Sequence, residues 1–392
     1  MTRTLLASAL LASTSTAALA GGLDRTGLPL DLLFEEGNYI ELGYAHTTPN
    51  ISGEGTGNTA LGPIIPPGTN YVGVGDDFGN FSAGVKLDLN EQWSVALQFE
   101  QPFGSDIIYN GDPASTELGG TTAIAETEAL TAIVRYKFDD NWSVHGGLRV
   151  QQARGNIELG GLAYGAPVPA GTPAFAGGFN GYRVELETNT ATGWLAGVAY
   201  EIPEIALRVA LTYNSEITHD FDTTEFYAGA AIGEGETEVE VPRSVNLDFQ
   251  TGIAEDTLLF GSFRWAEWSE FKIDPELFTA AANGGLVDLQ DSRTVELGVA
   301  RRFTEEFAGS AAFTWEETNS DDLVSPLAPT NGLFAVSLGG AYDVTENVVL
   351  SGGVRYSWLG NARPETGTPD TARAEFEDNR AVTVGFSVGY RF

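Results

Sequence analysis

Large apolar residues alternate strictly with small or polar residues at the carboxyl end of the chain. The even positions from Val382 to Phe392 are apolar or aromatic, and the odd positions from Ala381 to Arg391 are small or polar. A period of two predicts a β-strand whose two faces meet unlike surroundings. One such strand fits a soluble sandwich as well as a membrane barrel, so its recurrence along the chain has to distinguish the two.

The same alternation recurs in hairpins throughout the sequence. One hairpin turns at Asn90–Glu91 and another at Asp139–Asp140, each between two alternating segments. The pattern predicts fourteen strands in all. They span residues 38–48, 79–89, 92–102, 122–138, 141–157, 183–202, 204–220, 236–253, 256–273, 288–303, 306–317, 331–344, 347–360 and 380–392.

The connections between these strands are alternately short and long. Six are tight turns, and the seven long ones span 49–78, 103–121, 158–182, 221–235, 274–287, 318–330 and 361–379. An even number of strands of about ten or more residues, with turns at one end and loops at the other, is typical of outer-membrane barrels. A soluble sandwich has shorter strands. We therefore expect an all-β fold, a transmembrane antiparallel β-barrel over residues 38–392, with seven long extracellular loops.

Aromatic residues lie near the expected strand ends, as in the girdles of membrane barrels. Examples are Trp93 and Trp142 after turns and Trp358 near a loop. The apolar face should then contact lipid, and the last strand should close against the first so that no edge stays unpaired. The terminal Phe392 resembles the last aromatic residue by which the barrel-assembly machinery recognises outer-membrane proteins.

Composition and the amino terminus agree with an exported barrel. Residues 1–20 combine a short basic start, an apolar run and a small-x-small site, which predicts a signal peptide. The chain carries 54 acidic and 20 basic side chains, so its net charge of −34 argues against binding to nucleic acid. The sequence contains no cysteine, which excludes thiolate catalysis and zinc-thiolate sites.

Two local segments point to a family. Residues 241–271 lead from a proline-led strand through a turn to a Trp-x-x-Trp-Ser-x-Phe motif, and a Gln-Pro-Phe-Gly element ends the third strand. The residues concerned are Trp265, Trp268, Ser269 and Phe271 in the first segment, and Gln101, Pro102, Phe103, Gly104 and the following Tyr109 in the second. Both segments resemble the FadL/TodX family of outer-membrane transporters for long-chain fatty acids and other hydrophobic compounds.

The resemblance also implies an amino-terminal plug inside the barrel. Family members carry a longer hatch that ends in an Asn-Pro-Ala-Gly-like element. Here residues 21–37 precede the first strand, and Phe34, Glu35, Glu36 and Gly37 stand where that element would be. A shorter plug is therefore expected.

Two further segments are candidates for contact with cargo. The loop 158–182 is unusually apolar and carries Leu159, Leu162, Tyr164, Phe175 and Phe179, while Leu61, Ile64 and Ile65 lie in the first loop. Exposed apolar patches mark binding surfaces, so we interpret the loop as a landing surface for hydrophobic ligand. The alternative is that the loops pack on one another over the mouth of the barrel.

Pro102, Phe103 and Gly104 form the expected lateral gate. A proline removes a ladder donor, so the strand can bend inward and leave a gap through which cargo passes sideways into the bilayer. The alternative is that Pro102 only ends the strand. Basic residues expected in the lumen either meet a fatty-acid carboxylate or, as we favour, pair with lumenal acids. These basic residues are Lys86, Arg135, Arg149, Arg208, Arg264 and Arg302.

The predicted function is passive outer-membrane transport of long-chain fatty acids or hydrocarbons through a plugged barrel with lateral exit. A general diffusion porin is the main alternative, although it would favour more strands and an open channel. A barrel-based hydrolase is less favoured, because His46, His145 and His219 lie in no nucleophile motif. We expect no catalytic or metal site and no cofactor. The protein should be a monomer among outer-membrane lipid and lipopolysaccharide.

Overall fold

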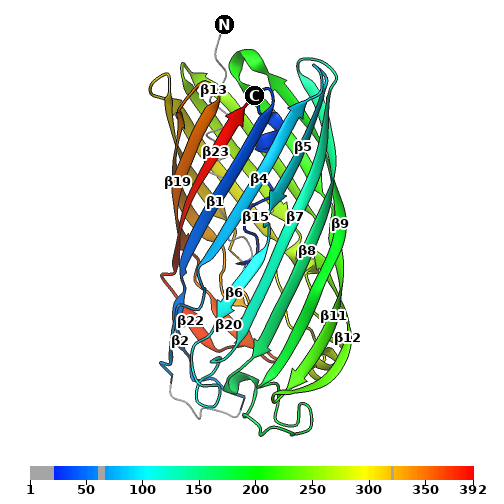
Figure 1. Ribbon diagram of the computed structural model, residues 1–392. Helices are drawn as coiled ribbons and strands as arrows, with labels where there is room; N and C mark the ends of the chain where they lie inside the picture. Colours follow the sequence, from blue (N-terminus) through cyan, green and yellow to red (C-terminus); the bar gives the residue numbers. More distant parts are fainter. Residues whose placement is uncertain (1–21, 61–66, 319–321) are drawn as a thin grey trace.

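The computed structural model describes residues 22–60, 67–318 and 322–392. The expected signal peptide, residues 1–20, and the apolar residues Leu61, Ile64 and Ile65 of the first loop lie outside this part of the chain. The remainder forms a tall barrel with strongly tilted strands (Figure 1).

The barrel wall is a closed antiparallel sheet of 14 strands, as the alternation predicted. Three of these strands consist of two segments each, namely β5 with β6, β10 with β11, and β12 with β13. The segments of the wall are β1 (Tyr39–Asn50), β4 (Phe78–Asp88), β5 (Trp93–Glu100), β6 (Gly104–Ile108), β7 (Thr122–Lys137), β8 (Trp142–Leu159), β9 (Tyr182–Ile202), β10 (Leu207–Asn214), β11 (Ile217–Tyr227), β12 (Ala230–Val241), β13 (Ser244–Ala254), β14 (Thr257–Ala266), β15 (Ser292–Arg302), β16 (Phe307–Glu316), β18 (Leu333–Asp343), β19 (Val348–Leu359) and β23 (Arg380–Arg391).

The last strand closes the barrel against the first. β23 pairs with β1 along its whole length, from Tyr39 opposite Arg391 to Asn50 opposite Arg380. The Phe392 N–H donates to the Asn38 carbonyl (3.1 Å). Because every wall strand has neighbours on both sides, the sheet has no free outer edge to pair with other chains.

The two ends of the barrel differ as expected, with one exception. Short turns and the carboxyl terminus lie at one end, and the long loops lie at the other (Figure 1). The segment 221–235, expected to be a long loop, instead extends β11 and β12 into a hairpin with a two-residue turn. Ala228 (φ 48°) and Gly229 (φ 79°) both adopt the left-handed conformation that such a turn requires. The expectation of seven long loops is therefore wrong at this position.

The loops carry small elements of their own. Two three-stranded sheets combine β2 (Ser52–Gly55), β3 (Asn70–Val72) and β22 (Ala374–Phe376), and β17 (Leu323–Val324), β20 (Arg363–Thr366) and β21 (Thr371–Ala372). The helical segments are η2 (Asp31–Phe34), η3 (Leu162–Tyr164), η4 (Pro203–Ile205), η5 (Trp268–Glu270) and α2 (Glu276–Ala282). Within the described residues no helix is long and apolar enough to cross a membrane.

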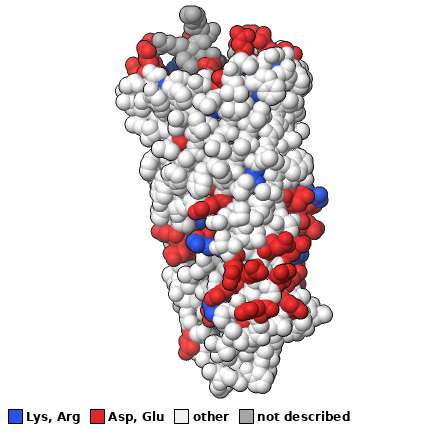
Figure 2. All heavy atoms as spheres, turned by 45° about the vertical axis from the view of Figure 1, so that its right-hand side comes forward, with Lys and Arg blue, Asp and Glu red and all other residues white. Residues whose placement is uncertain are grey.

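The outer surface has an apolar zone and an acidic zone. On β23 the side chains of Val384, Phe386 and Val388 are exposed, whereas Thr383 and Ser387 are buried inside. Closer to the loops, acidic side chains gather in a broad band on the outside of the wall (Figure 2). The apolar zone therefore marks the part of the wall that contacts lipid.

Candidate functional site

An apolar cavity lies inside the barrel, between the bend in the third strand and η5. Its lining is almost wholly hydrophobic and comes from six wall segments, the plug and the loops. The residues that line it include Leu23, Phe103, Gly104, Ala123, Ala153, Ile157, Leu186, His219, Phe221, Val239, Val241, Trp268, Phe271, Ile273, Val287 and Leu327. A concave and apolar site of this kind fits a hydrophobic ligand.

The third strand bends where the sequence places Pro102. β5 pairs with β7 as far as Glu100, and β6 resumes the pairing at Gly104 one residue out of register. The Thr127 hydroxyl accepts from the Phe103 N–H (2.9 Å) and donates to the Phe103 carbonyl (2.7 Å). The bulge turns Phe103 toward the lumen, where it lines the cavity.

The bend interrupts the wall between β4 and the third strand. β4 pairs with β5 only as far as Ala83 opposite Phe99, so its segment 78–82 has no ladder partner on that side. The Gln101 side chain partly replaces the ladder, because its Oε1 accepts from the Phe81 N–H (2.9 Å). A discontinuity in the wall is thus present at the expected lateral gate, and the gating role remains a prediction.

The plug supplies the missing partner of the bent strand from inside the barrel. The Arg25 N–H donates to the Pro102 carbonyl (2.8 Å), and the Gly104 N–H donates to the Leu23 carbonyl (3.0 Å). Arg25 also forms an ion pair with Asp106 on β6. The amino-terminal segment therefore lies beside the expected gate, where Asp24 and Phe103 form a single antiparallel bridge.

The tryptophan motif closes the other side of the cavity. Trp268 is almost fully buried, and its ring meets Phe103 edge to face, with centroids 5.6 Å apart. Ser269 and Trp265 fix the turn, since the Ser269 hydroxyl (2.7 Å) and the Trp265 indole N–H (3.2 Å) both donate to the Asp291 carboxylate. The two motifs recognised in the sequence thus contact each other across the lumen.

The end of the plug is anchored by charged wall residues. The Phe34 ring lies between the guanidinium groups of Arg135 and Arg208, at 4.6 and 4.5 Å from the ring centroid. Lys86 Nζ donates to the carbonyls of Glu35 (2.8 Å) and Gly37 (2.9 Å). The expected plug element therefore binds the wall mainly through Phe34 and main-chain carbonyls.

The two glutamates of this element differ in environment. Glu36 is exposed, whereas Glu35 is buried with its carboxylate 3.6 Å from Arg391. Burial raises the pKa of Glu35 to about 7, Arg391 acts in the opposite direction, and Glu41 raises it further. Glu35 therefore changes charge near neutral pH.

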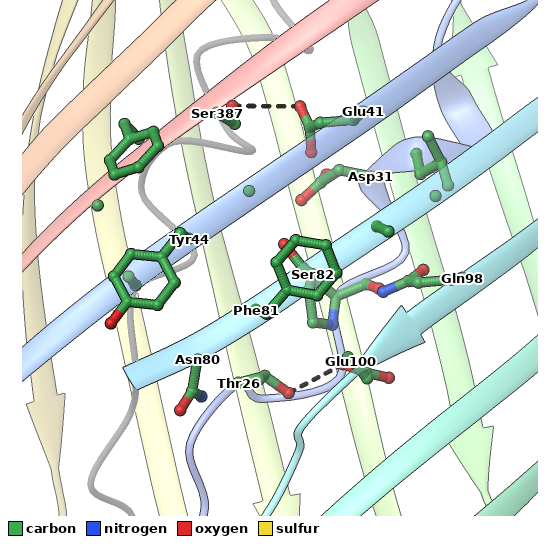
Figure 3. Close-up of a pocket in the computed structure, with 18 of the residues that line it drawn as sticks. Thr26, Asp31, Glu41, Tyr44, Asn80, Phe81, Ser82, Gln98, Glu100 and Ser387 are labelled. Atoms are coloured by element: carbon green, nitrogen blue, oxygen red, sulfur yellow. Dashed lines mark hydrogen bonds between the residues drawn. The ribbon is translucent and has the colours of Figure 1, made fainter. Parts of the chain in front are cut away.

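Further polar contacts hold the rest of the plug along the lumen. Asp24 forms an ion pair with Arg264 (2.7 Å) and Asp31 one with Arg208 (3.1 Å). The Thr26 hydroxyl donates to the Glu100 carboxylate (3.0 Å) beside a polar cavity that also contains Asp31 and Gln98 (Figure 3). A second polar cavity lies on the other side of the plug. The plug is thus a thin segment flanked by polar space.

Five of the six basic residues expected in the lumen, Arg302 being the sixth, form ion pairs with acids, as favoured from the sequence. Arg149 lies 3.6 Å from Glu100, Arg135 forms an ion pair with Glu201, and Arg264 and Arg208 bind plug aspartates. Arg154 is the one lysine or arginine among the described residues that line the apolar cavity. It is exposed and forms an ion pair with Glu126.

The five apolar residues of the loop 158–182 do not form an open surface. Leu159 and Leu162 are buried, while Tyr164, Phe175 and Phe179 are partly buried. The Phe175 ring contacts Tyr227 (5.4 Å), and the Phe179 ring contacts Phe278 of α2 (4.9 Å). The structure therefore agrees with the alternative that the loops pack on one another, and a role in ligand capture stays a prediction.

The histidines take part in structural contacts. His46 lies 3.4 Å from Asp77, and His145 is hydrogen-bonded to Thr212 (2.9 Å). His219 lies between Gln151 and Asn189. Within the described ranges no group of three or more acidic or histidine side chains could hold a metal ion.

Sequence reasoning missed most of the cavity lining. Its residues on β11 and β12, such as Phe221 and Val239, lie at positions that alternate like those of a lipid-facing strand. The pairing of Leu23 and Arg25 with the third strand was missed as well. The acidic residues on the opposite face of β11 and β12, such as Asp220 and Glu238, were the available signal.

A closed 14-stranded barrel in the outer membrane, with a lumenal plug and an apolar cavity, defines an outer-membrane transport protein. The chain belongs to the family described as outer membrane protein transport protein (OMPP1/FadL/TodX), whose model matches residues 36–392. Members of this family transport hydrophobic compounds. No curated protein matches the sequence directly.

Solved structures show the same fold at low sequence identity. A Pseudomonas aeruginosa FadL homologue superposes with a TM-score of 0.71 at 16% identity, covering 97% of this chain and 98% of that one. The Pseudomonas putida toluene transporter TodX gives 0.63 at 16% identity, with 92% of each chain covered. The Ralstonia pickettii toluene transporter TbuX gives 0.61 at 12% identity, covering 98% of this chain and 94% of that one.

Proposed function

We propose that this protein carries uncharged hydrophobic molecules, such as hydrocarbons or long-chain alcohols, passively across the outer membrane. The observation that carries the proposal is the apolar cavity between the bent third strand and Trp268. Burying apolar area there stabilises a ligand by about 25 cal/mol per Å². The lumenal arginines lie in ion pairs away from this cavity, so a carboxylate would meet no free cation among the residues described as lining it.

The proposed path has three stages. Phe175 and Phe179, which are partly exposed, give a first contact at the loops, with Leu159, Leu162 and Tyr164 supporting them. The ligand then binds in the cavity. It leaves sideways at Pro102–Gly104 into the bilayer, because movement into an aqueous periplasm would reverse the gain of burial.

A matched pair of cargo molecules tests the substrate class. Oleyl alcohol and oleate share one hydrocarbon chain and differ in the charge of the head group. Radiolabelled oleyl alcohol should accumulate faster in cells that express the protein than in cells without it. The protein should increase the accumulation rate of oleate much less. An equal or larger gain for oleate would show that the protein carries anionic fatty acids instead.

A matched pair of variants tests the cavity. Trp268→Ala should lower the protein-dependent uptake about tenfold, since a loss of about 1.4 kcal/mol in binding changes affinity by that factor. Trp358→Ala removes a tryptophan that is exposed on the outer face, and it should leave uptake unchanged. Equal uptake by both variants would reject the cavity as the binding site.

The polar cavities on both sides of the plug support a second candidate, the passage of small hydrophilic solutes. Both cavities contain charged side chains, including Asp31, so water can occupy them. Swelling of liposomes that contain the protein in small sugars measures this activity. Rapid swelling would favour a porin, and its absence together with uptake of oleyl alcohol would favour the proposed function.

A further inference from the structure

The barrel wall has a second discontinuity, between the sixth and seventh strands. β9 pairs with β10 as far as Leu195 opposite Asn214, and the Ser215 N–H donates to the Trp194 carbonyl (2.9 Å). Pairing resumes only where Leu186 lies opposite Thr223 on β11. The segments 187–193 and 216–222 have no ladder between them, and we call this stretch the window.

Both strands remain intact along the window, so the discontinuity is not a frayed end. The β9 side pairs with β8, for example Asn189 with Ala153. The β11 side pairs with β12, for example His219 with Val239. The two strands are each held by their other neighbour and are not joined to one another.

Two bulges placed at opposite ends of the window explain the missing ladder. β9 has its bulge at 187–188, where it faces Arg154 of β8. The seventh strand has its bulge at the other end. Asn214 and Ile217 are three positions apart and would face opposite sides of a regular strand, but both are buried inside the barrel. Between the bulges the strands are out of phase by one residue, so their hydrogen-bonding groups do not align.

Side chains close the window in place of the ladder. His219 Nδ1 lies 3.1 Å from Asn189 Oδ1, and His219 Nε2 lies 3.1 Å from Gln151 Oε1. The Asn189 amide donates to the Asp220 carbonyl (2.6 Å), which links the two strands. Leu186, His219 and Phe221 also line the apolar cavity, so these side chains form its wall at the window.

The window lies just beyond the lipid-facing zone. The rings of Trp194 and Tyr213, 5.3 Å apart, stand at its periplasmic edge, as an aromatic girdle would. Past them the outward residues are exposed and polar, and Figure 2 shows acidic side chains gathered on this face of the barrel. These residues are Glu187, Thr188, Thr190, Thr192, Glu216, Thr218, Asp220 and Asp222. At this height water can satisfy unpaired backbone groups, which the bilayer core does not permit.

We propose that the window is a second side portal, through which uncharged hydrophobic molecules pass between the lipopolysaccharide layer and the apolar cavity. The proposal rests on the proposed function, and it adds a route that bypasses the packed loops. Rotation of His219 and Asn189 opens the portal without breaking any ladder hydrogen bond. The acidic rim repels carboxylates, which gives the protein a physical basis for excluding fatty-acid anions.

A reversible block of the window tests the portal. The chain contains no cysteine, so Ala191→Cys places a single thiol inside the window, and Ala230→Cys places one at the exposed hairpin tip as a control. Modification of each variant with a bulky methanethiosulfonate reagent is followed by reduction. The probe is radiolabelled oleyl alcohol, and the readout is protein-dependent uptake.

After modification, the Ala191→Cys variant should take up oleyl alcohol more slowly, because only the route through the loops remains, and reduction should restore its uptake. Uptake by the Ala230→Cys variant should not change. Unchanged uptake in the fully modified Ala191→Cys variant would overturn the portal. If the unmodified protein itself fails to increase uptake, the proposed function fails instead, so the two outcomes are distinguishable.

Deletion of Thr188 provides an independent test by removing the β9 bulge. The two strands then meet in phase up to the bulge at 215–216, and the ladder should become continuous across the former window. Amide protection of residues 216–222 in hydrogen exchange verifies the closure. A closed wall with undiminished uptake of oleyl alcohol would reject the portal, and reduced uptake in a heat-modifiable, folded barrel would support it.

Discussion

The ring of Phe103 meets the ring of Trp268 edge to face, with centroids 5.6 Å apart and planes at 85°. Phe103 lies in the bulge of the third strand, and Trp268 begins η5 after the ninth strand. The contact therefore joins the two segments that resemble the FadL/TodX family into one wall of the cavity. A substitution of either residue should therefore change how much the other contributes to stability.

The first prediction is an energetic coupling between these two rings. Trp268→Ala alone should cost about 3–5 kcal/mol, because it leaves a large buried void. In a double-mutant cycle with Phe103→Ala, the coupling should be about 0.5–1.5 kcal/mol, the range of aromatic pairs. Chemical unfolding in lipid vesicles measures the four free energies. Strict additivity would contradict the contact.

The second prediction concerns Gly104, where a side chain would collide with the guanidinium of Arg25. Gly104→Ala should therefore displace the Arg25 side chain from its ion pair with Asp106 and loosen the amino-terminal segment beside Pro102. Trypsin should then cut the folded barrel after Arg25, which is buried in the native protein. Gly146→Ala is the matched control, because its new methyl group would meet only the Leu195 carbonyl at 3.5 Å. Resistance of both variants to trypsin would contradict the proposed effect of Gly104→Ala on the contact between the amino-terminal segment and the third strand.

The third prediction concerns the orientation of the last strand. Phe386 is 61% exposed on the outer face, and its neighbour Ser387 faces the polar lumen beside Glu41. Phe386→Arg should cost about 2–4 kcal/mol if the residue lies near the bilayer midplane, and Ser387→Arg should cost less. Unfolding from lipid vesicles compares the two variants. Similar losses of unfolding free energy in the two variants would contradict a lipid-facing Phe386 and a lumen-facing Ser387.

The fourth prediction is a pH dependence of plug binding. Burial raises the pKa of Glu35 from 4.5 to about 7, so the folded state holds this proton more tightly than the unfolded state. The stabilisation from this group is complete below about pH 4.5 and is lost as pH rises through about 7. The thermal midpoint should therefore fall less between about pH 5 and about pH 8 in Glu35→Gln than in the unchanged protein.

Glu36→Gln is the control for this pH dependence. Glu36 is adjacent in sequence and exposed, so its substitution should preserve the slope of the unchanged protein. The same slope in all three proteins would contradict a buried, neutral Glu35.

The alternation of the sequence was sufficient to predict the barrel, because each lipid-facing strand must repeat it. The bend at Pro102 was predictable as well, since proline cannot donate to the ladder. The loop at 221–235 was misjudged because Ala228–Gly229 lacks the asparagine or aspartate of common hairpin turns. Local composition there resembles a loop, and the left-handed conformation of Ala228 is visible only in the fold.

The cavity could not be predicted from the alternation of apolar and polar residues, because bulges reverse the two faces of a strand without changing that alternation. Most odd positions from Leu207 through Phe221 carry apolar or aromatic residues, and Ser215 and His219 are the exceptions. The bulge at 215–216 moves these positions from the lipid side, where Leu211 lies, to the lumen, where Ile217 and Phe221 lie. A period of two contains no information about such a reversal, which depends on the register of the neighbouring strands.

The fifth prediction tests exit at the bend of the third strand. The Asn80 amide donates to the Gln101 carbonyl (3.3 Å), so these two residues face each other across the unpaired part of the wall. Asn80→Cys combined with Gln101→Cys allows a short, reducible bifunctional thiol reagent to bridge the gap. If ligand leaves sideways here, the bridge should abolish uptake of oleyl alcohol, and reduction should restore it. The purified bridged protein should still bind the alcohol, because Phe103 and Trp268 are unchanged.

Thr48→Cys combined with Val382→Cys is the control. It bridges two residues that face each other in the continuous wall between β1 and β23, and it should not affect uptake. Undiminished uptake in the bridged Asn80–Gln101 variant would show that the ligand does not leave between β4 and the bent strand.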